Sequence, residues 1–343
     1  MKKYVLAILA VVSLTFIVIA NAEEPRLRDN VPETHTVVKG DTLWDISSTF
    51  LQNPWMWPEI WHVNTQIANP HLIYPGDVIR LIYMDGQPRL TLDNSGRIYK
   101  LEPKAHVLST GEAIDTIPLD RINNFLSKSR IVSREELQLA PYVVSGADDH
   151  LIVGAGDSVY ARGDLAEERS VYGIYREGDQ YVDPETKEVL GVMAKDIGSG
   201  TVKSIRGEIT TLDITRTVEE IRAGDRLLRE EERAIETNFY PSAPNAPIEG
   251  QILAVEGGVS QVGRLDVVVI NRGSRELVKV GNVLSVFKRG HRIKDRVAGG
   301  YVMLPDEKAG LVMIFRVFEK ISFGLVLEAD QGLKVKDRVV NPE

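Results

Sequence analysis

The pattern of apolar and polar positions predicts a strand, a turn and a helix near the N-terminus. Residues 36–38 are a short strand-like run that stops at the Lys-Gly-Asp turn of residues 39–41. Asp41 or Thr42 can cap a following helix by accepting a backbone N–H hydrogen bond. Beyond the turn, apolar side chains recur at a spacing close to one helical face, at Leu43, Trp44, Ile46, Phe50 and Leu51.

A second helix and a final strand complete this first unit. Pro58 can open a helix over residues 59–63, because its missing N–H would have no partner there in any case. Asn-Pro at 69–70 breaks the chain, and Pro-Gly-Asp at 75–77 turns it into a last strand. The pattern therefore predicts a β-α-α-β unit over residues 35–82.

The next segment, residues 83–140, has a mixed pattern. Residues 91–101 could form a hairpin. Ser133, with Glu136 three positions later, fits a helix capping box. The sequence leaves open whether this segment is a linker or a small docking domain.

From residue 141 onward, short β-like runs alternate with Gly and Asp turns, and three blocks recur in the same order. The pairs are VGAGDSVYARG (153–163) with VGRLDVVVINRG (262–273), VYGIYREG (171–178) with VLSVFKRG (283–290), and AGDRLL (223–228) with VKDRVV (335–340). This recurrence indicates a duplicated small β unit, and barrel-like closure would remove exposed strand edges. We expect a first unit at 141–236, a Pro-rich linker at 237–249 and a second unit at 250–343.

The N-terminus has the pattern of a secretory signal. Lys2 and Lys3 precede an apolar run at 5–19, and Ala-Asn-Ala follows as a small-x-small cleavage site. An uncleaved anchor is the alternative, but the run of ~15 residues is shorter than the ~20 that a spanning helix needs. We expect cleavage after Ala22, a flexible leader at 23–34 and, in a host with an outer membrane, a periplasmic location.

Charge and cysteine content narrow the possible functions. The net charge of −8 disfavours nucleic acid as a partner, because phosphate binding needs a surplus of Lys and Arg. The absence of cysteine excludes thiolate catalysis, disulfides, Cys-based zinc sites and a lipid-modified cysteine. Glu59 and His62 have a metal-like spacing without a second pair, and His150 follows two aspartates without a Gly-x-Ser-x-Gly elbow. We expect no catalytic residue, no metal and no cofactor.

The stretches VVKGDTLWDISSTF and NPHLIYPGDVIRL resemble the LysM family of β-α-α-β modules, which bind N-acetylglucosamine-containing glycans such as peptidoglycan. The resemblance implies a shallow groove whose first wall is Gly40, Asp41, Thr42 and Leu43. It implies a second wall of Asn69, Pro70, Leu72 and Ile73. Free backbone N–H and C=O groups in such loops can bond the acetamido group, and Leu72 or Ile73 can contact the acetyl methyl.

One departure from the LysM pattern is an insert at residues 52–58. Together with the next turn, it brings three tryptophans within seven residues: Trp55, Trp57 and Trp61. Core packing is one interpretation of these side chains. The other is an aromatic platform that stacks on a sugar ring or a protein partner.

The order of signal, single LysM module and long β region resembles the type IV pilus secretin-associated protein family. That family pairs LysM with a region similar to the C-terminal domain of a flagellar assembly protein. The resemblance implies a non-enzymatic anchor that holds an outer-membrane secretin ring to peptidoglycan, with many copies compensating for weak single-site binding. A LysM-targeted cell-wall hydrolase and a scaffold for a flagellar or other envelope ring stay open as alternatives. The predicted fold class is α+β, with the LysM module followed by a mainly-β region of two duplicated small barrel-like units.

Overall fold

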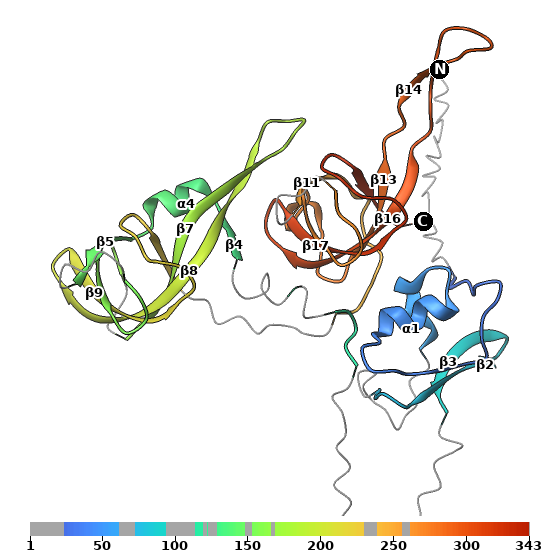
Figure 1. Cartoon of the computed structure of the whole chain (residues 1–343), viewed down its shortest axis with the longest axis horizontal. Helices are drawn as coiled ribbons and strands as arrows, with labels where there is room; N and C mark the ends of the chain where they lie inside the picture. The colour runs from blue at the N-terminus through green and yellow to red at the C-terminus, as the bar shows by residue number, and fades with distance from the viewer. Residues whose placement is uncertain are drawn as a thin grey trace, which may run out of the picture.

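The computed structural model of the chain divides into an N-terminal module, a middle β part and a C-terminal barrel (Figure 1). It describes residues 24–61, 73–93, 114–118, 122, 129–147, 153–165, 169–229, 239–255 and 261–342. The expected signal segment, residues 1–22, lies outside these ranges. No helix in the described ranges combines the length and the apolar character needed to cross a membrane.

The N-terminal module has the expected β-α-α-β order and one further strand. Its elements are β1 (Thr34–Thr36), α1 (Leu43–Phe50), the 3-10 turn η1 (Pro54–Met56), α2 (Trp57–Ile60), β2 (Val78–Met84) and β3 (Gln87–Leu92). The strands form an antiparallel sheet in the order β1-β2-β3. Asp85 and Gly86, both with positive φ, make the tight turn between the last two strands. Most of the hairpin expected over residues 91–101, from residue 94 onward, lies outside the described ranges.

The core of the module is built from one face of α1 and from the insert that follows it. The apolar side chains that set the predicted helical face are all buried, as are those of η1 and α2. The second helix is shorter than expected and places Pro58 within its first turn, where proline is tolerated. Burial of these side chains against β2 and β3 accounts for the position of both helices.

The middle part is a sheet whose strands close on themselves. Its elements are β4 (Ser129–Val132), α4 (Arg134–Leu139), β5 (Tyr142–Gly146), β6 (Ser158–Arg162), β7 (Val171–Val182), β8 (Val189–Arg206), β9 (Ile209–Thr217) and β10 (Arg226–Arg229). The order is β4-β8-β7-β10-β5-β6-β9, and β8 also pairs with β9. Six strands thus form a ring, with β4 attached outside. Ser133 caps α4: its Oγ accepts from the Glu136 N–H at 3.0 Å, which is the first of the two hydrogen bonds of the predicted capping box.

The C-terminal part is a closed six-stranded barrel. Its elements are β11 (Glu249–Val255), β12 (Val267–Ile270), the 3-10 turn η3 (Ser274–Glu276), β13 (Val283–Lys288), β16 (Glu307–Val317), β17 (Ser322–Ala329) and β18 (Arg338–Val340). The strands close in the order β11-β12-β17-β16-β13-β18. Between β13 and β16, a two-stranded arm of β14 (Arg292–Lys294) and β15 (Tyr301–Met303) projects from the barrel (Figure 1).

The two rings connect their strands in the same order. When the six strands of each ring are numbered along the chain, neighbouring strands follow one another around the ring in the order first, second, fifth, fourth, third, sixth. Their recurring sequence blocks also make the same turns. The Arg222 N–H donates to Asp225 Oδ2 at 2.8 Å before the last strand of the middle ring, and the Lys334 N–H donates to Asp337 Oδ2 at 2.9 Å before that of the barrel. The recurring AGDRLL and VKDRVV blocks thus mark equivalent turns.

The long β7–β8 hairpin brings the middle part against the barrel. Asn271 Nδ2 donates to Asp183 Oδ2 at 2.8 Å. Glu188, also near the hairpin tip, pairs with Lys320 at 2.8 Å and Arg275 at 3.0 Å. A hydrogen bond from Lys320 and, as the next largest cause, one from Arg275 lower the pKa of the Glu188 carboxyl. This hairpin contact is therefore ionic and depends on a charged carboxylate.

Candidate functional site: the LysM groove

The first predicted wall is a turn stabilised by its own side chain. The Asp41 N–H donates to the Val38 carbonyl at 3.1 Å, and Asp41 Oδ2 accepts from the Val38 N–H at 3.0 Å. His35 Nε2 lies 3.0 Å from the same carboxylate oxygen. Gly40 has a φ of 97°, with no atom within 4 Å of the position a Cβ would take. Gly40 and Asp41 therefore shape this wall, with the carboxylate of Asp41 bonded inside the turn.

Thr42 then starts α1 with a complete capping box. Its Oγ1 accepts from the Asp45 N–H at 3.2 Å, and its own N–H donates to Asp45 Oδ2 at 3.3 Å. The sequence left Asp41 and Thr42 as alternative caps, and the structure selects Thr42. The first N–H groups of a helix have no acceptor within it. The N–H groups of Leu43 and Trp44 are therefore available to an acceptor outside α1, while both side chains are buried.

The two N–H groups at the start of α1 bind a distant part of the chain. The Leu43 N–H donates to the Asp115 carbonyl at 3.0 Å, and the Trp44 N–H donates to the Thr116 carbonyl at 3.3 Å. On the opposite wall, the Ile73 carbonyl accepts from the Ile114 N–H at 2.9 Å. Residues 114–118, named here the strap, therefore bond to both walls. Sequence reasoning missed this contact, because nothing in the pattern of residues 83–140 relates it to the groove.

The structure describes one residue of the second predicted wall. Ile73 is fully buried, so its side chain belongs to the core and only its backbone carbonyl reaches the groove. Asn69, Pro70 and Leu72 lie outside the described ranges. For the described part of this wall, the contact with a ligand would thus involve the backbone of Ile73 and not its side chain.

The tryptophans of the insert lie mostly in the core. Trp55 and Trp57 are buried, whereas Trp61 is half-buried and forms a bridge with Leu90. Within the described part of the chain, Nε1 of Trp55 and of Trp57 has no hydrogen-bond partner. The Trp57 ring lies 6.0 Å from that of Tyr240, which precedes the barrel. Burial of two of the three rings favours the packing interpretation over a sugar platform.

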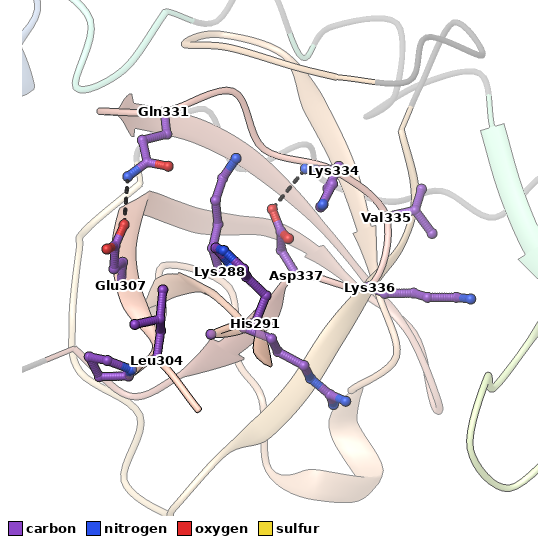
Figure 2. Close-up of a pocket in the computed structure, with 12 residues that line it drawn as sticks. Lys288, His291, Leu304, Glu307, Gln331, Lys334, Val335, Lys336 and Asp337 are labelled. Atoms are coloured by element: carbon purple, nitrogen blue, oxygen red, sulfur yellow. Dashed lines mark hydrogen bonds between the residues drawn. The ribbon is translucent and has the colours of Figure 1, made fainter. Parts of the chain in front are cut away.

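A second candidate surface is a cavity of ≈ 520 Å³ at the end of the barrel next to the arm. Figure 2 shows Lys288 between the side chains of Glu307 and Asp337, with Lys334 and Lys336 along one rim. Burial raises the pKa of Asp337, against the opposing effect of its neighbouring lysines. Among the described residues, no cluster of three or more His, Asp or Glu side chains could hold a metal ion. The cavity has the chemistry of a cationic contact surface.

Comparison with known proteins assigns the N-terminal module to a domain family. Residues 35–81 match the LysM domain family. Over 69 residues the chain is 35% identical to "Uncharacterized protein YqbP" of Bacillus subtilis (strain 168), an alignment that covers 17% of this chain and 32% of that protein. The chain thus spans about a third of the length of this relative. Residues 35–81 are therefore assigned to the LysM domains, a class of non-catalytic modules whose members bind N-acetylglucosamine-containing glycans of peptidoglycan.

Proposed function

We propose that this chain is a non-enzymatic periplasmic protein that binds peptidoglycan and anchors an envelope machine, the outer-membrane secretin ring of the type IV pilus, to the cell wall. The observation that carries the glycan part is the pair of N–H groups of Leu43 and Trp44, each bound to an amide carbonyl. The acetamido group of N-acetylglucosamine presents the same carbonyl chemistry. The groove therefore has donors suited to this sugar, with Gly40 leaving room for its close approach.

Co-sedimentation with purified peptidoglycan sacculi tests this part of the proposal. Gly40→Val places a β-branched residue at a φ of 97° and distorts the first wall. Gly207→Val makes the same change at a φ of 61° in a turn of the middle part, also in open space. We expect binding to fall several-fold for Gly40→Val and to be retained for Gly207→Val. If both variants bind sacculi equally well, the first wall is not part of the glycan-binding site.

The anchoring part of the proposal rests on the β region. Two rings with the same strand order support the interpretation of a duplicated unit. The cavity of Figure 2 and the adjoining arm give this region a cationic surface on a chain of net charge −8. Electrostatic complementarity would then select an acidic face on the partner. Several copies around a ring would raise the avidity of weak individual LysM sites.

Capture experiments with the full chain test the identity of the partner. Immobilised protein should retain the purified, detergent-solubilised secretin of the host. Lys334→Glu together with Lys336→Glu reverses the charge of the cavity rim and should weaken this retention. Retention of a flagellar or other envelope ring protein in place of the secretin would support the alternative scaffold.

A further inference from the structure

We propose that the LysM groove of this chain carries its own ligand, the strap of residues 114–118, and that a glycan binds by displacing it. The inference rests on the proposed function, because it assumes that the groove receives a glycan. It adds a competing occupant with a defined sequence, Ile-Asp-Thr-Ile-Pro. It also implies that glycan binding changes the contact between the LysM domain and the barrel.

The hydrogen bonds of the strap occupy the donors proposed for the sugar. Consecutive carbonyls, of Asp115 and Thr116, accept from consecutive N–H groups at the start of α1 at 3.0 and 3.3 Å. The strap also spans the groove, since the Ile114 N–H donates to Ile73 on the other wall at 2.9 Å. An N–H group bound to a peptide carbonyl cannot at the same time bind an acetamido carbonyl in its place. Strap and glycan are therefore mutually exclusive at these donors.

Burial shows that the strap is docked into the module. Ile117 is fully buried, Thr116 is 2% exposed and Ile114 is 7% exposed, whereas Asp115 is exposed. Ile114 and Ile117 belong to the same apolar cluster as the side chains of α1 and α2. Removing this apolar surface from water stabilises the docked strap. The glycan must therefore outcompete both hydrogen bonds and apolar contacts.

The occupied groove is connected to the barrel through the segment that precedes β11. Thr116 Oγ1 accepts from the Phe239 N–H at 3.3 Å, and Phe239 is buried. Tyr240 contacts the Trp57 ring, and the Ser242 N–H donates to the Gly281 carbonyl of the barrel at 3.0 Å. Displacing the strap breaks the first of these links. A glycan in the groove would thereby loosen the LysM domain from the barrel.

Competition of this kind has a quantitative consequence. When only a fraction of molecules has an open groove, the apparent dissociation constant is the intrinsic one divided by that fraction. A variant that releases the strap should bind glycan more tightly than the unmodified chain. We expect a gain of at least tenfold, which corresponds to a strap docked in at least roughly nine molecules in ten.

A single introduced thiol reports the state of the strap, because the chain has no cysteine of its own. Thr116→Cys places the thiol in the buried centre of the strap. We expect slow labelling by maleimide without ligand and labelling at least several-fold faster with saturating chitotetraose, an N-acetylglucosamine tetramer. Leu139→Cys places a thiol at a position that is 87% exposed, at the end of α4. Its labelling should be fast and independent of chitotetraose.

A second pair of variants measures the affinity gain. Ile117→Asp puts a charge at the fully buried position of the strap and should release it, while Leu139→Asp makes the same change at an exposed site. Titration of the full chain with chitotetraose should show tighter binding for Ile117→Asp alone. Intrinsic tryptophan fluorescence, confined to residues 44–61, confirms that the LysM domain of each variant is folded.

The possible outcomes distinguish a failure of the strap proposal from a failure of the proposed function. Fast labelling of Thr116→Cys without ligand would overturn the docked strap. Slow labelling that chitotetraose does not accelerate, although the unmodified chain binds it, would overturn competition. If neither the unmodified chain nor folded Ile117→Asp binds chitotetraose, the glycan function fails and competition fails with it, while slow labelling of Thr116→Cys would still identify the strap as an intramolecular contact.

Discussion

Trp57 distinguishes a core role for the tryptophan insert from a sugar-binding role. Its side chain is 1% exposed, and within the described ranges its indole N–H has no hydrogen-bond partner. Truncation of a buried tryptophan to alanine costs about 3–5 kcal/mol. A domain of this size has roughly 0.05–0.15 kcal/mol of stability per residue, or ~2–7 kcal/mol in total. Trp57→Ala should therefore remove a large part of the stability of the LysM domain.

The substitution Trp57→Phe should have a much smaller effect. It keeps an aromatic ring in the core and loses part of the buried area, at a cost of ~1–2 kcal/mol. It also removes the unpaired N–H, whose burial costs ~1–3 kcal/mol. The two terms are similar in size and opposite in sign. We therefore expect the free energy of unfolding to change by less than ~1 kcal/mol.

Urea unfolding followed by tryptophan fluorescence is a selective assay for this prediction. All four tryptophans lie in the LysM domain, at Trp44, Trp55, Trp57 and Trp61. The fluorescence transition therefore reports this domain alone, whether or not the other parts of the chain unfold with it. If Trp57→Ala unfolds at the same urea concentration as the unmodified chain and loses chitotetraose binding, Trp57 acts as a sugar platform and the core assignment is wrong.

Three further predictions concern other contacts. Thr42→Ala removes the cap of α1 and should destabilise the LysM domain by ~1 kcal/mol in the same urea assay, with Thr42→Ser close to neutral. Arg176→Ala removes the ionic partner of the buried Asp225 carboxylate and should destabilise the middle part by ~3–5 kcal/mol in thermal unfolding. Arg162→Ala, at an exposed ion pair, should cost at most ~1 kcal/mol. The lowered pKa of Glu188 means that its barrel contact is complete above the ordinary carboxyl value of 4.5 and is lost as pH falls through the lowered value. Hydrogen-exchange protection of the β7–β8 tip, relative to the intrinsic rate at each pH, should fall over that acid range, and Glu188→Gln should abolish the change.

Local signals in the sequence predicted the LysM domain well. Thr42 and the spacing of apolar residues after it define α1, because capping and helical periodicity are properties of a few neighbouring residues. The family resemblance of residues 35–82 is matched by the LysM assignment of residues 35–81. The pattern did not predict β3, because its pairing with β2 depends on the tight Asp85-Gly86 turn and not on the periodicity of the strand itself.

Long-range contacts could not be predicted in the same way. The strap forms its hydrogen bonds with residues more than 40 positions away. Its two isoleucines, three positions apart, give no indication of the surface against which they pack. The ionic contact of Glu188 with Lys320 likewise joins surfaces that are distant in the sequence. By contrast, repetition in sequence carries long-range information. The recurring blocks predict a duplicated β unit, and the shared strand order of the two rings is consistent with that prediction.

The most direct test of the central claim is an NMR titration of the isotope-labelled full chain with chitotetraose. We predict saturable shifts of the Leu43 and Trp44 amide signals, the donors at the start of α1. The amide signals of Thr116 and Ile117 should move at the same time toward positions typical of an unstructured segment. Unchanged Leu43 and Trp44 signals at millimolar chitotetraose, in a chain whose LysM domain is folded, would contradict the account.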